Sequence, residues 1–135
     1  MKNRKKILLS GIGLIIGIGL VFGGNYLYRA HKYQQIVADI EIQPINLAEI
    51  SDGVYSGHFD ALLVGAKTKV TVKDHKISAV ELVEHKTELG EKAEKIVKDV
   101  VNQQSLAVDT VSGATNSSKV ILKSIDNALN SEPSD

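Results

Sequence analysis

The chain has 135 residues, no cysteine, and 16 acidic against 16 basic side chains. Without cysteine, disulfides, iron–sulfur clusters, thiolate metal sites and cysteine nucleophiles are excluded. Four tyrosines and two phenylalanines are the only aromatic residues, which is too few for a platform that stacks single-stranded nucleic acid. We therefore expect no nucleic-acid partner, and any redox chemistry must come from a bound cofactor.

The net charge of zero conceals two oppositely charged parts. Residues 1–32 contain six basic residues and no acid, hence +6, whereas residues 33–135 contain ten lysines and all 16 acids, hence −6. Such an asymmetry indicates that the two parts occupy different environments.

A membrane anchor is predicted near the N-terminus. Residues 7–28 form a 22-residue stretch without a charge, and as a helix this stretch would span about 33 Å, close to the hydrocarbon thickness of a bilayer. Four basic residues crowd into residues 1–6, so the positive-inside rule places this segment in the cytoplasm and the rest of the chain outside.

A cleaved signal peptide is the alternative to a retained anchor. The apolar stretch is longer than the usual h-region of about 7–15 residues, and no small-x-small cleavage pattern follows Gly24, so the pattern favours a retained anchor. Gly13-x-x-x-Gly17 and Gly19-x-x-x-Gly23 are similar to helix-dimerisation motifs. Glycine is common in membrane helices in any case, so helix pairing stays open.

Residues 29–50 read as a spacer between the anchor and a folded domain. Their mixed polar and aliphatic pattern predicts a helical extension followed by an extended connector that Pro44 interrupts. We expect the domain itself to comprise residues 51–131, with residues 132–135 as a polar tail.

The first half of this domain is predicted to form strands. A turn at Asp52-Gly53 leads into a short strand over residues 54–59. Alternation of lysine with smaller β-favouring residues predicts a hairpin with strands at 67–73 and 77–83, joined by a turn at 74–76.

The second half is predicted to be helical. In residues 88–104 one helical face carries Leu89, Ala93, Ile96, Val97, Val100 and Val101. In residues 117–130 the positions predicted to face inward are Val120, Ile121, Ser124, Ile125, Ala128 and Leu129. The predicted fold class is therefore α+β, a small antiparallel sheet with packed helices, preceded by one N-terminal transmembrane helix.

The loop before the second of these helices is the candidate functional site. Residues 109–115 read Asp-Thr-Val-Ser-Gly-Ala-Thr, in which Gly113 allows main-chain N–H groups to approach a ligand and Ala114 keeps the volume small. The N-terminus of the following helix offers unpaired N–H groups and a positive dipole end, which favour a phosphate.

Neighbouring polar residues extend this prediction. Ser112 and Ser117 are further hydroxyl donors for the phosphate oxygens, and Asn116 or Ser117 is expected to cap the helix. The alternative is an ordinary loop whose serine, glycine and threonine only end a strand and cap a helix.

Three segments together resemble one known family. Residues 109–115 resemble the signature D-x-x-[ST]-G-A-[ST], residues 52–57 resemble D-G-x-Y-x-G, and residues 70–77 resemble the hairpin V-x-V-x-D-G-K-I. These are motifs of the FMN-binding domain family, represented by the C subunit of the sodium-pumping NADH:quinone oxidoreductase and the G subunit of the Rnf complex. The resemblance covers residues 47–130.

The resemblance implies that Thr115 carries FMN as a phosphodiester. A separate Mg²⁺-dependent flavin transferase would use FAD as donor and release AMP. Asp109 would be recognised by that enzyme or would stabilise the loop. Its alternative role is to form an Asx-turn ahead of the loop. The chain would be a bacterial, membrane-anchored, extracytoplasmic electron carrier between a membrane donor and an extracytoplasmic acceptor, rather than a self-contained enzyme. A module that binds FMN noncovalently and a flavin-free interaction domain remain alternatives.

Two segments depart from the family pattern. His75 replaces the hairpin glycine, and residues 85–90 replace a segment similar to H-x-E-T-P-G that borders the flavin ring in relatives. Thr87, Glu88 and Leu89 are the expected neighbours of the flavin ring. The alternative role of Thr87 is to be the N-cap of the next helix.

Few other side chains suit a flavin or a metal. Tyr55 and Phe59 are the only aromatic residues of the predicted domain, so we expect a largely exposed ring. The four histidines show no short-range ligand pairing and are expected on the surface.

Overall fold

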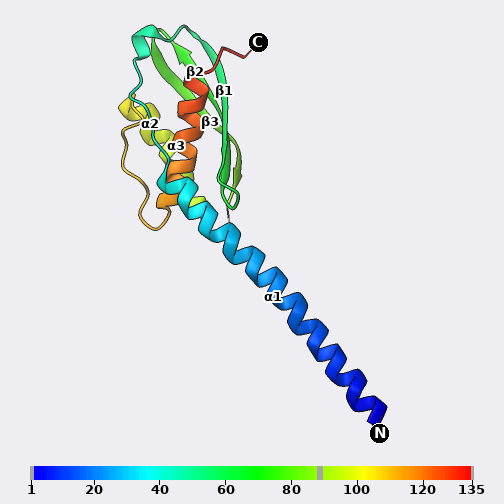
Figure 1. Ribbon diagram of the computed structural model, residues 1–135. Coiled ribbons are helices and arrows are strands. Elements are labelled where there is room, and N and C mark those ends of the chain that lie inside the picture. The colour runs from blue at the N-terminus through cyan, green and yellow to red at the C-terminus, as the bar shows by residue number, and fades with distance from the viewer. Residues whose placement is uncertain (1, 88–89, 135) are drawn as a thin grey trace.

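The computed structural model describes residues 2–87 and 90–134 and shows an α+β domain at the end of one long helix (Figure 1). The predicted fold class is confirmed. In chain order the elements are α1 (Lys2–Ala38), η1 (Leu47–Glu49), β1 (Gly53–Asp60), β2 (Gly65–Lys73), β3 (Lys76–Lys86), η2 (Glu91–Lys95), α2 (Ile96–Gln103) and α3 (Thr115–Leu129).

The three strands form one antiparallel sheet in the order β1-β2-β3. Asp74 and His75 connect β2 to β3 with φ angles of 52° and 56°, and two positive φ values are the mark of a type I′ hairpin turn. The Asp52 carboxylate accepts the His75 N–H at 3.3 Å. This bond stabilises the positive-φ conformation of His75.

Helix α3 covers one face of the sheet, along β1 and β2 (Figure 1). Its predicted inward positions are all buried: Val120, Ile121, Ser124, Ile125, Ala128 and Leu129. A Cβ on Gly57 of β1 would lie 2.7 Å from the Ala128 Cβ and would also collide with the Ser124 carbonyl oxygen. Strand and helix therefore approach closely because position 57 has no side chain.

The helix predicted over residues 88–104 differs at its N-terminal end. The structure has the 3₁₀ turn η2 followed by α2, which ends at Gln103, and Glu88 lies outside the described residues. Ala93, Ile96 and Val100 are buried as predicted. A 3₁₀ turn is a common start for a helix whose first N–H groups lack a capping side chain, and η2 has none.

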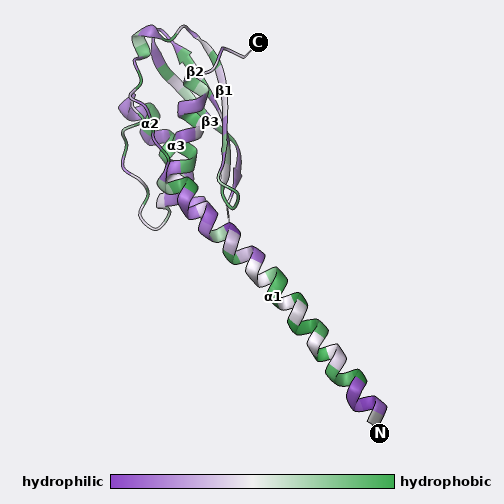
Figure 2. Cartoon of the chain, viewed as in Figure 1, coloured by the Kyte–Doolittle hydropathy of each residue, from purple (hydrophilic) through white to green (hydrophobic). Residues whose placement is uncertain are grey.

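Helix α1 extends away from the domain, and its middle is almost entirely apolar (Figure 2). Large side chains such as Leu9, Ile15 and Phe22 are 68–72% exposed. By length and composition this helix is able to cross a membrane, and burial of these exposed side chains in lipid would remove their apolar surface from water.

The C-terminal end of α1 is part of the domain. Val37 is 3% exposed within the core, and Tyr33 and Ile36 pack partly against it. Apolar residues of the following segment also lie on the core, namely Ile40, Ile42, Ile45, Leu47 and Ile50. Lys123 of α3 donates to the Glu41 carbonyl oxygen at 2.8 Å. The segment that leaves the helix is therefore held on the domain surface.

Candidate cofactor site

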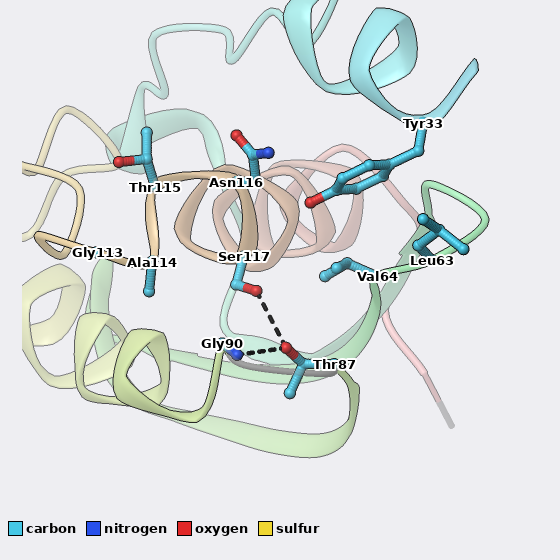
Figure 3. Close-up of a pocket in the computed structure, with 10 residues that line it drawn as sticks. All are labelled: Tyr33, Leu63, Val64, Thr87, Gly90, Gly113, Ala114, Thr115, Asn116 and Ser117. Atoms are coloured by element: carbon cyan, nitrogen blue, oxygen red, sulfur yellow. Dashed lines mark hydrogen bonds between the residues drawn. The ribbon is translucent and has the colours of Figure 1, made fainter. Parts of the chain in front are cut away.

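A cavity of about 400 Å³ lies at the N-terminal end of α3 (Figure 3). This end of α3 lies beside the C-terminal end of α1 (Figure 1). Four segments contribute to the cavity: α1, the β1–β2 loop, the segment before η2, and the start of α3. Its lining residues are Tyr33, Leu63, Val64, Thr87, Gly90, Gly113, Ala114, Thr115, Asn116 and Ser117. The volume lies within the usual range for small-molecule sites.

The loop that precedes α3 is a fixed turn. The Ala114 N–H donates to the Val111 carbonyl oxygen at 2.9 Å, and Gly113 between them has φ of 78°. This is a left-handed conformation that strongly favours glycine. A Cβ at Gly113 would meet no atom within 4 Å, so the main chain faces open space here.

Ser118 holds both ends of this turn. Its fully buried hydroxyl accepts the Val111 N–H at 3.0 Å and donates to the Ala114 carbonyl oxygen at 2.8 Å. Sequence reasoning missed this residue. Its position in the sequence, on the same helical face as Ile121 and Ile125, indicates burial. A buried hydroxyl without a hydrogen-bond partner destabilises the fold, so Ser118 is expected to make such bonds.

Helix α3 begins two residues earlier than predicted, at Thr115. Ala114 is the N-cap and no side chain caps the helix, so the predicted capping by Asn116 or Ser117 is wrong because both residues lie inside the helix. The first N–H groups of a helix have no intrahelical acceptors. At the start of α3 they are left available to an anion, together with the positive end of the helix dipole.

Thr115 is exposed. Figure 3 shows its side chain at the end of the cavity opposite Tyr33, with the hydroxyl directed away from that tyrosine. Asn116, also exposed, lies between them. The Thr115 oxygen is thus within reach of another protein.

Thr87 and Ser117 close the floor of the cavity. The Thr87 hydroxyl accepts the Gly90 N–H at 2.6 Å and lies 3.4 Å from the hydroxyl of Ser117, which is buried (Figure 3). A Cβ on Gly90 would be 2.6 Å from the Ser117 Cβ. The N-cap of η2 is Gly90, so the alternative role of Thr87 as that N-cap is wrong.

The structure brings together six of the predicted site residues, namely Thr87, Gly113, Ala114, Thr115, Asn116 and Ser117. Ser112 and Asp109 are exposed and do not line the cavity. Glu88 and Leu89 lie outside the described residues.

Sequence reasoning missed the apolar end of the cavity, which consists of Tyr33, Leu63 and Val64. Tyr55 and Phe59, the aromatic residues of the predicted domain, lie outside the cavity lining. Tyr55 is buried in the core and donates its hydroxyl to the Ser51 carbonyl oxygen at 2.7 Å. Phe59 lines a separate hollow against Lys123. The local sequence around Tyr33 gives no sign of its contact with the domain, because residues 29–50 are predicted to be a spacer.

One histidine differs from expectation. The side chain of His85 is 3% exposed rather than on the surface, and its Nδ1 lies 3.1 Å from a Glu94 carboxylate oxygen. In the described residues no group of three potential metal ligands occurs. The ring packs between β3 and η2, outside the cavity lining.

Comparison with known proteins gives one match. Residues 65–130 match the family model described as FMN-binding domain, a span that runs from the start of β2 to the end of α3 and includes the turn at Gly113 and Thr115. No curated protein matches the chain.

Proposed function

We propose that this chain is a member of the FMN-binding domain family, whose model matches residues 65–130, and that Thr115 carries the FMN through a phosphodiester bond in a membrane-anchored electron carrier. The observation that supports the proposal is the position of Thr115. It is an exposed hydroxyl on the first residue of an uncapped helix, at the edge of a cavity.

The cavity fits both parts of the cofactor. At one end the N–H groups of α3 and the open main chain at Gly113 suit phosphate oxygens. At the other end Tyr33, Leu63 and Val64 present apolar surface suited to a flat aromatic ring.

In the attachment step the Thr115 oxygen would attack the phosphorus of FAD that belongs to the FMN half. A new P–O bond to threonine forms, the bond to the AMP phosphate breaks, AMP leaves, and the hydroxyl proton is lost. Among the described residues that line the cavity, the Tyr33 phenol is the sole ionisable group. These described lining residues thus include no general base at neutral pH, which supports a separate Mg²⁺-dependent transferase as the catalyst.

Asp109 suits recognition by that transferase. It is exposed six residues before Thr115 and outside the cavity. A carboxylate in this position can be contacted by another protein without disturbing the bound cofactor.

When bound, FMN supplies reversible uptake and release of electrons. The chain holds the cofactor beside its anchor helix, with the basic residues 2–6 in the cytoplasm and the domain outside. A covalent bond prevents loss of FMN by dilution outside the cell, because occupancy no longer depends on the free concentration. Electrons would pass from a membrane donor to an extracytoplasmic acceptor.

The proposal is tested with the full chain produced together with an active flavin transferase. We expect the intact mass to rise by one FMN less one water, and a denatured gel band to fluoresce. Thr115→Val should abolish both signals, and valine is preferred to serine because serine is itself a nucleophile. Thr110→Val, a change at an exposed threonine in the same loop, is the matched control and should keep both.

Three results would contradict the proposal. Modification that persists in Thr115→Val would place FMN on another residue. Yellow colour that leaves on denaturation would indicate noncovalent binding. A colourless protein, from cells in which the transferase modifies another acceptor, would indicate a flavin-free domain.

A further inference from the structure

We propose that Tyr33, at the domain end of α1, contacts the isoalloxazine ring together with Leu63 of the β1–β2 loop, so that the anchor helix is itself part of the cofactor site. This inference rests on the proposed attachment of FMN to Thr115. It concerns where the ring lies rather than how the cofactor is attached.

Tyr33 is held in place by the packing of α1 on the domain. Val37, one helical turn further on, is buried in the core, and Ile36 packs against the same core. Figure 3 shows the Tyr33 ring extending from α1 over the cavity, with its hydroxyl directed inward. The phenol is half-buried, so one part of it remains available to a ligand.

The β1–β2 loop is fixed opposite Tyr33. Leu62 has φ of 72°, a strained conformation for a residue with a branched side chain. Asp60 accepts the Leu62 N–H at 2.6 Å, and Lys86 donates to the Leu62 carbonyl oxygen at 2.6 Å. The Ala61 N–H also donates to the Val64 carbonyl oxygen at 2.8 Å.

These contacts fix the main chain on both sides of Leu63. The side chains of Leu63 and Val64 lie next to Tyr33 in Figure 3, and all three line the cavity. Strained backbone held by surrounding bonds is typical of ligand-binding loops.

The two ends of the cavity match the two ends of FMN in order. The phosphate would lie at Thr115 and the ring at Tyr33, with Asn116 between them (Figure 3). Among the described residues that line the cavity, Tyr33 is the one whose side chain can stack on an aromatic ring.

This placement also sets the distance of the ring from the bilayer. Tyr33 lies five residues after Tyr28, the last residue of the charge-free stretch, and five helical residues span about 8 Å. The ring would therefore lie close to the membrane surface, which favours a donor within the membrane.

The inference is tested by flavin fluorescence of the full chain carrying FMN. An electron-rich phenol in contact with an oxidised flavin quenches its emission, whereas a phenylalanine ring is a poor quencher of similar shape. We expect Tyr33→Phe to increase the emission severalfold over the unsubstituted protein, with equal FMN content by mass. Tyr28→Phe, an exposed position on the same helix, is the control and should not change the emission.

A second variant tests whether Tyr33 shields the flavin from solvent, independently of quenching by its phenol. Tyr33→Ala should increase quenching of the flavin by dissolved iodide, because it removes one wall of the cavity, whereas Tyr33→Phe should leave iodide quenching unchanged. Equal emission of the Tyr33→Phe and unsubstituted proteins, at equal FMN content, would overturn the inference. Absence of FMN from the unsubstituted protein would instead contradict the proposed function, so the two failures are distinguishable.

Discussion

The two ends of the cavity are built differently. The polar end is one continuous segment, residues 111–118, whose turn is closed by its own main chain and by the buried Ser118 hydroxyl. The apolar end is assembled from α1 and the β1–β2 loop, which are far apart in the sequence, and is held by exposed groups such as Lys86 and Asp60. The proposed attachment site is thus formed by neighbouring residues, whereas the proposed surroundings of the ring depend on the whole fold.

This difference predicts separate consequences for stability and for the cofactor. Substitutions that disturb the buried Ser117 or Ser118 at the polar end should lower the free energy of unfolding. Substitutions of Lys86 or Asp60, the exposed groups that hold the β1–β2 loop at the apolar end, should leave stability nearly unchanged and alter the environment of the flavin.

The largest effect is expected at Gly90, beside the buried Ser117. Gly90→Ala would place a Cβ 2.5 Å from the Thr87 hydroxyl and 2.6 Å from the Ser117 Cβ. Overpacking of this kind costs about 1–3 kcal/mol, and we expect the upper part of that range in guanidinium unfolding of the full chain in detergent. Gly24→Ala, whose Cβ would meet open space, is the control. A Gly90→Ala protein as stable as this control would contradict the described floor of the cavity.

Ser118→Ala should have the next largest effect. It removes the acceptor of the buried Val111 N–H, and an unsatisfied buried group costs about 1–3 kcal/mol. Ser112→Ala, an exposed change in the same turn, should alter the free energy of unfolding much less. Equal losses in the two variants would show that Ser118 does not hold the turn.

The same contrast explains what the sequence could and could not predict. The turn at Gly113, the helix that follows and the exposed Thr115 depend on neighbouring residues, so local patterns indicate them. The strands and the inward face of α3 follow from simple periodicity. The N-cap was predicted wrongly because Ala114, which has no capping group, takes that place.

Long-range contacts account for the rest. Tyr33 reaches the cavity because α1 continues past the apolar stretch and packs Val37 into the core. No local pattern around Tyr33 indicates such packing. His85 was expected on the surface for the same reason, since its burial depends on η2 and the contact with Glu94.

Lys86→Ala tests the apolar end with a small expected cost. Its side chain is 49% exposed and pairs with Asp60 at 3.4 Å, so the loss of stability should be below about 1 kcal/mol. The freed loop should nevertheless raise iodide quenching of the flavin. Lys67→Ala, which breaks an exposed pair between Lys67 of β2 and Glu84 of β3, is the control. If both variants leave iodide quenching unchanged, the loop does not cover the ring.

The smallest effect is expected at Asp52, far from both ends of the cavity. Main-chain N–H groups of Asp74 and His75 lower the pKa of its carboxyl below the ordinary 3.8. A lowered pKa in the folded state gives stability that is present above pH 3.8 and is lost as the pH falls through the folded value. Unfolding measured across this range should show a shallower acid dependence in Asp52→Asn than in the unsubstituted protein. An identical acid dependence would exclude this contribution.

The central claim is that one threonine holds the cofactor, and peptide mass spectrometry tests it most directly. Trypsin cleaves after Lys98 and after Lys119 and should release residues 99–119. This peptide contains Thr115 and several other hydroxyl residues. We predict that fragmentation of this peptide assigns one FMN less one water to Thr115. Assignment to another residue, or an unmodified peptide from cells in which the transferase is active, would contradict the account.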